Sequence, residues 1–196
     1  MLEPETKKYL ALNELAETGG TVILGDDLDK EIPLCELKQA FNLNEKLYNR
    51  SFSKLSIQDA IEIYDSCIAA LKPDCVLLHI GEADVKLFDN TPSVFEHYFR
   101  KLIQHIKEED KKCNIGIISL RNPNNSETIT ELNKSLKYIA NSEKCEFEDI
   151  SVKRVWNPKE TKDVVSFVYS TGFVRPLKNQ RSIYDLTKIL FCYEAK

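Results

Sequence analysis

The sequence predicts an α/β protein, a three-layer α/β/α sandwich around a five-stranded parallel sheet. Short apolar runs rich in β-branched residues alternate along the chain with longer stretches of helical periodicity, which is typical of stacked βαβ units. The strongest of these runs are apolar on both faces, as interior parallel strands must be. Six glycines and seven prolines in 196 residues favour long regular elements with short connections, and we expect one domain spanning residues 1–196.

The first half of the chain is expected to hold three strands and three helices. Residues 5–18 form a helix with Leu10, Leu12 and Leu15 among its apolar positions, and Gly19-Gly20 ends it. A buried strand follows at 21–24, then a short helix at 33–41 and a weaker strand at 46–49. A capping box at 56–59 starts the next helix, which Pro73 ends. The strongest strand covers 75–80.

The second half is expected to continue the alternation. A helix at 92–108 with apolar residues on one face leads to a strand at 115–120. A helix at 126–141 and a fifth strand at 145–150 follow, and a final helix covers 182–193. Residues 151–179 are the least regular part of the sequence.

Composition limits the classes of partner and location. The formal charge of -4 is too close to balance to favour nucleic acid, and we expect no membrane span and no signal peptide. The cysteines lack the close pairs that zinc sites use, so we expect reduced core thiols and a cytoplasmic protein. These cysteines are Cys35, Cys67, Cys75, Cys113, Cys145 and Cys192.

Ligands of open parallel sheets bind beyond the carboxyl ends of the strands. The loops at these ends are residues 25–27, 49–54, 81–84 and 121–123. In order and spacing they resemble the motif blocks of the SGNH hydrolases, also called the GDSL esterase and lipase family. The resemblance implies that family's flavodoxin-like sheet over nearly the whole chain.

Four blocks carry the resemblance. Val22-Ile23-Leu24-Gly25-Asp26-Asp27 resembles the apolar strand that runs into Gly-Asp-Ser in the family. Asn49-Arg50-Ser51-Phe52-Ser53-Lys54 resembles Asn-Arg-Gly-Ile-Ser-Gly. Lys72-Pro73-Asp74, followed by an apolar strand and Gly81-Glu82-Ala83-Asp84, resembles the block that ends in Gly-x-Asn-Asp. Thr171-Gly172-Phe173-Val174 is the best match to the final Asp-Gly-x-His block.

The resemblance also implies where catalytic groups should lie, and none has its usual identity. Asp27 takes the place of the nucleophilic serine, and a carboxylate is not activated by a base as a hydroxyl is. Ala83 and Lys54 replace the asparagine and glycine of the oxyanion hole, although Lys54 keeps a backbone N–H. Thr171 replaces the orienting aspartate, and Val174, or Arg175 after a one-residue shift, replaces the histidine.

Several readings of the remaining polar groups stay open. Asp27, Asp84 and Glu82 form a possible divalent cation site, but we expect Asp26 and Asp84 to hold loops by accepting backbone hydrogen bonds and the other carboxylates, including Asp29, to be solvated. We therefore expect no metal and no cofactor. A second hypothesis is a salt bridge from Asp27 to Lys54 or Arg175. A third is an anionic ligand held by Arg50, Arg121 or Arg175.

The sequence thus favours a catalytically inactive SGNH hydrolase-like protein that binds a sugar, acyl or anionic small molecule, or regulates a protein partner. The alternative is an acylhydrolase acting on lipid or carbohydrate esters with a rearranged site. That site would use Ser51 or Ser53 as nucleophile and His79 as base, although His79 is expected to be a core or cleft-wall residue. His97 and His105 are expected at or near the surface.

Overall fold

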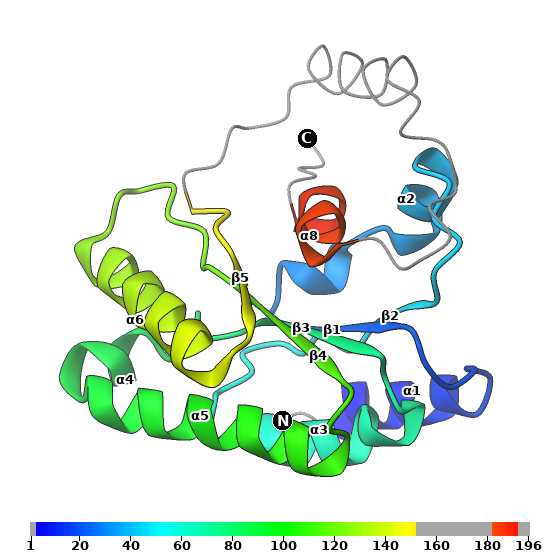
Figure 1. Cartoon of the computed structure of the whole chain (residues 1–196), viewed down its shortest axis with the longest axis horizontal. Coiled ribbons are helices and arrows are strands. Elements are labelled where there is room, and N and C mark those ends of the chain that lie inside the picture. The colour runs from blue at the N-terminus through cyan, green and yellow to red at the C-terminus, as the bar shows by residue number, and fades with distance from the viewer. Residues whose placement is uncertain (1–2, 152–181, 192–196) are drawn as a thin grey trace.

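The computed structural model describes residues 3–151 and 182–191 (Figure 1). The strands of this part form one parallel sheet in the order β2-β1-β3-β4-β5. The strands are β1 (Thr21–Gly25), β2 (Leu47–Asn49), β3 (Cys75–His79), β4 (Asn114–Ile118) and β5 (Glu146–Glu148). The predicted five-stranded parallel sheet is confirmed.

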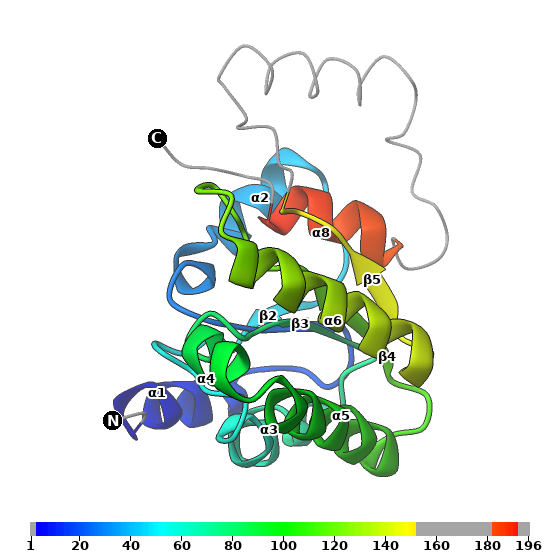
Figure 2. The ribbon, with the colours of Figure 1, turned by 90° about the vertical axis from the view of Figure 1, so that its left-hand side faces the viewer.

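Helices cover both faces of the sheet. On one face lie α2 and α8, and on the other lie α1 and α3 to α6 (Figures 1 and 2). The helices are α1 (Glu3–Asn13), α2 (Leu34–Ala40), α3 (Ala60–Cys67), α4 (Val85–Asn90), α5 (Pro92–Glu109), α6 (Glu127–Glu143) and α8 (Ile183–Phe191). Short 3₁₀ turns occupy Asp29–Glu31 (η1) and Ala69–Leu71 (η2). This is the predicted three-layer sandwich.

The two central strands explain the two cores. Successive side chains of a strand point to opposite faces. Val22 and Val76 therefore contribute to the core beneath α3, α5 and α6, whereas Ile23 and Leu77 pack with α2 and α8. All four side chains are fully buried, which agrees with the two-sided apolar pattern of the strongest predicted strands.

The first helix differs from its prediction. It ends at Asn13 rather than at residue 18, and Leu10, Leu12 and Leu15 are 46, 40 and 84% exposed. Among the α1 side chains whose burial is described, Tyr9 is the buried one: its ring packs edge-on against Phe52 and its hydroxyl donates to the Ser51 carbonyl at 2.6 Å. This anchor sets which side of α1 faces the sheet, and the leucine spacing does not reveal it.

Other elements lie close to their predicted bounds. Ser126 caps α6 through its side chain, which accepts a hydrogen bond from the Ile129 N–H. The short helix α4 was not predicted, because six residues ending before Pro92 are too few to show a helical repeat. No described helix has the length and apolarity that crossing a bilayer requires.

The expectation of core thiols is confirmed for three cysteines. Cys67, Cys75 and Cys113 are buried and unbridged, and Cys145 is half-buried. Cys35 contradicts the expectation because it is exposed on the short helix α2. Cys192 lies outside the described residues.

Candidate functional site

The carboxyl ends of β1 and β3 bring a polar cluster together. These strands are neighbours, and Gly25 at the end of β1 is in register with His79 at the end of β3. Asp26 and Asp27 continue directly from β1. The sheet register thus places residues from distant parts of the sequence at one edge, where open α/β sheets bind their ligands.

A tight turn carries Asp29 back onto the end of β1. The Asp29 N–H donates to the Asp26 carbonyl at 3.2 Å, which starts the 3₁₀ turn η1. The side chain of Asn49, at the end of β2, holds this turn by donating to the Asp29 carbonyl at 2.6 Å. Gly25 leaves the space that Asp29 fills: a Cβ at Gly25 would lie 2.0 Å from Asp29 Oδ2.

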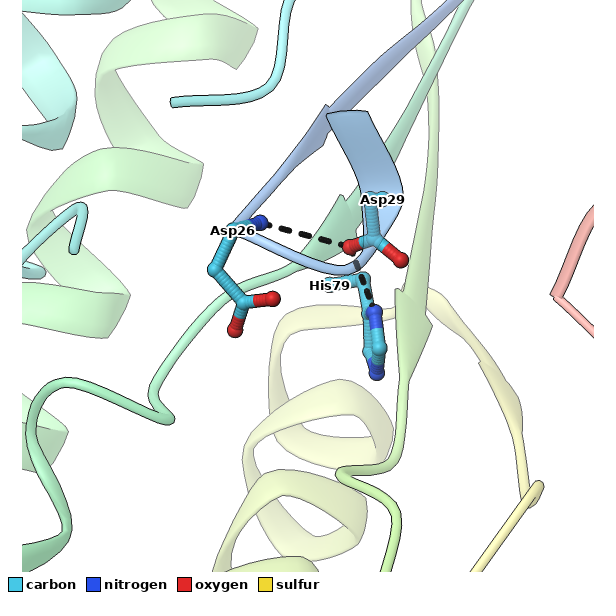
Figure 3. Close-up of side chains that lie close together, drawn as sticks. All are labelled: Asp26, Asp29 and His79. Atoms are coloured by element: carbon cyan, nitrogen blue, oxygen red, sulfur yellow. Dashed lines mark hydrogen bonds and ion pairs between the residues drawn. The ribbon is translucent and has the colours of Figure 1, made fainter. Parts of the chain in front are cut away.

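The Asp29 carboxylate makes the central contact of the site. Its Oδ2 lies 2.6 Å from His79 Nδ1 and accepts a longer hydrogen bond, 3.3 Å, from the Asp26 N–H (Figure 3). Asp29, in the turn η1, and His79, the last residue of β3, are fifty residues apart in the sequence. The pairing fixes Nδ1 of the ring toward the carboxylate, which leaves Nε2 as the other nitrogen that chemistry can use.

All three members of the cluster are buried. Asp26 and His79 are 3% exposed and Asp29 is fully buried. Part of the cover comes from α8: the Phe191 ring meets the His79 imidazole edge-on, with centroids 5.0 Å apart. Arg121, which follows β4, donates to the Phe191 carbonyl at 3.1 Å and so ties the end of α8 to the same edge.

Several polar atoms of the cluster have no hydrogen-bond partner within the described part of the chain. They are both carboxylate oxygens of Asp26, Oδ1 of Asp29 and Nε2 of His79. One ligand atom from each residue can be chosen so that all three lie within 4.8 Å of one another. Buried polar atoms without partners are rare in folded proteins, so this group calls for an explanation.

The surroundings shift the protonation of the cluster. Burial raises the pKa of Asp26 to about 7, and the charges of Asp29 and Glu82 add to the rise while His79 opposes it. For His79, burial lowers the pKa, but the charge and hydrogen bond of Asp29 outweigh it and the pKa is raised.

Asp26 and Asp84 were both expected to hold loops, and they differ. Asp84 is buried and its Oδ2 accepts the Ile57 N–H at 2.8 Å, as expected. The Asp26 carboxylate accepts no backbone hydrogen bond from a described residue. Asp29, which was expected to be solvated, takes over that role and is fully buried. The sequence signal that identifies it is a carboxylate four residues after a strand that ends in glycine.

The arginines expected to bind an anion are engaged elsewhere. The Arg50 guanidinium is buried: it donates to Asn13 Oδ1 through Nε and Nη2, at 3.0 and 2.7 Å, and lies over the Tyr9 ring of α1. Arg121 bonds to the Phe191 carbonyl. Arg175, Thr171 and Val174 lie outside the described residues. In the described part, carboxylates rather than arginines dominate this edge.

The serines of the second block also have other roles. Ser51 is fully buried and its Oγ accepts the Gly25 N–H at 3.1 Å, whereas Ser53 Oγ accepts from Lys30 Nζ at 2.6 Å. Neither makes a hydrogen bond to His79 within the described residues. Lys54 has a left-handed backbone with φ 53°, a conformation that suits the glycine of the family block.

Asp27 is exposed at the end of β1. No ion pair joins it to Lys54 in the part of the chain that the structure describes, so the predicted Asp27–Lys54 salt bridge is wrong. The alternative pair with Arg175 involves a residue outside the described part. Glu82 and Ala83 are likewise exposed after β3, at the edge where Asp27 lies. His97 is exposed, and half-buried His105 pairs with Asp65 at 2.6 Å, so both lie near the surface as expected.

Comparison with solved structures identifies the fold. A protein from Streptococcus pneumonia, provisionally described as a platelet activating factor, superposes with a TM-score of 0.66 at 18% identity, covering 81% of this chain and 78% of the other. A GDSL-like lipase from Bacteroides thetaiotaomicron superposes with a TM-score of 0.57 at 18% identity, covering 79% of this chain and 82% of the other. An acetylxylan esterase from Geobacillus stearothermophilus, solved as a catalytic mutant, superposes with a TM-score of 0.54 at 18% identity, covering 85% of this chain and 99% of the other. The chain has the SGNH hydrolase fold.

No family model and no curated protein matches this sequence. The SGNH likeness therefore rests on structure, and it agrees with the strand-end blocks of the sequence. At the identities found it establishes the architecture, while the chemistry of this edge depends on the residues that the chain itself places there.

Proposed function

We propose that this SGNH-fold protein binds a small cationic ligand at the carboxyl ends of β1 and β3, and does not hydrolyse esters by the serine mechanism. The observation that carries the proposal is the buried Asp26–Asp29–His79 cluster, with four polar atoms that lack described partners. Together with exposed Asp27 and Glu82, the Asp26 and Asp29 carboxyl groups outnumber the basic groups His79 and Arg121 at this edge, which favours cations over anions.

The position of Asp27 supports the absence of serine chemistry. It follows β1 where the family resemblance places the nucleophile, and its side chain is an exposed carboxylate. General-base activation requires a proton on the nucleophile, and an ionised carboxylate has none to lose. Ala83, at the position that the resemblance assigns to an oxyanion-hole asparagine, has no side-chain donor.

A hydrolase with a rearranged site is the second candidate, and one observation favours it. His79 and Asp29, 2.6 Å apart and buried, have the geometry of the base and orienting residue of a catalytic triad. Such a site also needs a nucleophile within hydrogen-bond reach of His79 Nε2. Neither Ser51, which accepts from the Gly25 N–H, nor Ser53, which accepts from Lys30, is such a nucleophile.

Hydrolysis of p-nitrophenyl acetate tests the non-hydrolytic part of the proposal. We expect equal rates for the unmodified protein, His79→Ala and the surface control His105→Ala, because accessible imidazoles give only a slow background reaction. Turnover that His79→Ala abolishes and His105→Ala preserves would establish the hydrolase instead.

Thermal unfolding with a ligand panel tests the binding part. We expect the unfolding temperature to rise by about 2 °C or more with at least one cation among spermidine, guanidinium and divalent metal ions, because a ligand that binds only the folded state stabilises it. Sugar acids and nucleotides should leave it unchanged. Stabilisation by anions alone would refute the assignment of a cationic ligand.

A further inference from the structure

We propose that Asp26, Asp29 and His79 form a binding site for a divalent transition-metal ion, of the class of Zn²⁺ or Mn²⁺. The inference rests on the proposed cation-binding function and names the ion and its ligands. It differs from the cation site considered from the sequence, whose ligands would have been Asp27, Asp84 and Glu82. Asp27 and Glu82 are exposed, and Asp84 is occupied by the Ile57 N–H.

The first argument is the cost of the cluster without a ligand. Burying a polar group without a hydrogen bond costs about 1–3 kcal/mol, and more for an ionised carboxylate. Both oxygens of Asp26 and Oδ1 of Asp29 have no described partner although the two residues are 3 and 0% exposed. An ion bound by one oxygen of each carboxylate reduces this cost.

The second argument is geometry. Zinc lies about 2.0–2.2 Å from nitrogen and oxygen ligands, so ligands of one ion are separated by roughly 3–4 Å. One atom from each of the three residues lies within 4.8 Å of the others. The 4.8 Å limit exceeds that separation by about 1–2 Å, so the side chains must move toward one another when the ion binds.

The third argument is donor chemistry. Two carboxylates and one imidazole suit Zn²⁺, Mn²⁺ and Fe²⁺, whereas Ca²⁺ and Mg²⁺ prefer oxygen ligands only. The two carboxylates also balance the charge of a dication. Of the charged groups nearby, Glu82 adds to the attraction and Arg121 opposes it, as their effects on Asp26 and His79 indicate.

The fourth argument is that other groups fix the ligands. The Asp26 N–H donates to Asp29 Oδ2, Asn49 holds the Asp29 carbonyl, and Phe191 packs against the imidazole. Contacts of this kind orient metal ligands in proteins and raise affinity. Three protein ligands leave coordination positions open for water or a further ligand.

Metal binding to the EDTA-treated, dialysed full chain tests the proposal. Zn²⁺, Mn²⁺, Mg²⁺ and Ca²⁺ are added separately, bound ion is counted by elemental analysis after equilibrium dialysis, and Co²⁺ serves as a probe of visible absorption. We expect one Zn²⁺ or Mn²⁺ per chain with micromolar or tighter affinity, weak Mg²⁺ and Ca²⁺ binding, and a Co²⁺ band that requires His79.

Variants decide whether the bound ion is at this site. Asp26→Asn loses no described hydrogen bond, so it should stay folded, and we expect it to weaken binding at least about 10-fold. His79→Gln should do the same. The control is His105→Gln, which alters a second His–Asp pair of the same 2.6 Å length but half-exposed on α5, and should leave binding unchanged.

Each outcome decides the question. Loss of binding in Asp26→Asn and His79→Gln with retention in His105→Gln supports the site. No binding of Zn²⁺ or Mn²⁺ below 1 mM, or affinity insensitive to Asp26→Asn, overturns it and leaves buried water as the partner of these atoms. Stabilisation by spermidine without metal binding would overturn this inference alone, whereas ester turnover abolished by His79→Ala would overturn the proposed function.

Discussion

Replacing Asp84 with asparagine removes a buried negative charge but keeps an oxygen that can accept the Ile57 N–H. Burial raises the pKa of Asp84 from 3.8 to about 6, because its hydrogen bond from Ile57 only partly offsets the lost hydration. Between pH 4 and 6 the folded state therefore holds a proton that the unfolded chain has released. The stability due to this group is present below about pH 4 and is lost as pH rises through about 6.

The size of the effect follows from the shift. A change of about two pKa units, at about 1.4 kcal/mol each, corresponds to about 3 kcal/mol. Asp84→Asn does not titrate, so its free energy of unfolding relative to the unmodified protein should rise by up to this amount between pH 4 and 7. Other titrating groups, Asp26 and His79 among them, are present in both proteins and cancel in the difference.

Urea unfolding at pH 4, 5, 6, 7 and 8, followed by circular dichroism, measures this difference. The matched control is Asp89→Asn, which removes an exposed carboxylate of α4 and should give a nearly flat difference curve. A difference for Asp84→Asn that stays flat, or that falls as pH rises, would show that the charged carboxylate stabilises the loop and would refute the reasoning.

Three further substitutions test the packing around the site by the same unfolding measurement. Gly25→Ala should cost about 1–3 kcal/mol, because its Cβ would displace Asp29 from His79, and an unchanged stability would contradict the close approach. Asn133→Ala should cost about 2–4 kcal/mol, since the buried amide pairs with both the N–H and the carbonyl of Leu120, and a loss below 1 kcal/mol would contradict this. Lys54→Gly should gain about 0.5–1 kcal/mol by relieving a left-handed backbone, and a loss of stability would count against that strain.

The sequence predicts the centre of this fold better than its edges, for a physical reason. Strands β1 and β3 are buried on both faces, so nearly every residue must be apolar and the pattern is unambiguous. Helix α1 has only one buried face, and a single anchoring tyrosine decides its orientation. The leucine spacing alone therefore predicts the wrong side.

The sequence directed attention to the edge of the sheet where the candidate site lies, but it did not predict which side chains form the cluster. The strand-end rule directs attention to Asp26, whereas His79 was expected to be a core or cleft-wall residue; the parallel register of β1 and β3 brings the two to one edge. Whether a carboxylate beyond a strand turns inward depends on space left by its neighbours. Asp29 turns inward because Gly25 has no side chain, and this three-dimensional condition separates it from exposed Asp27.

The contact between Phe191 and His79 has a consequence for the order in which the chain matures during synthesis. Both partners of the Asp29–His79 pair leave the ribosome long before α8, which supplies part of their cover. Until that last helix is made and docks, the pair has water on the side that α8 later occupies. Domains form as units during translation, so the final burial of this polar cluster must await the last described turn of the chain.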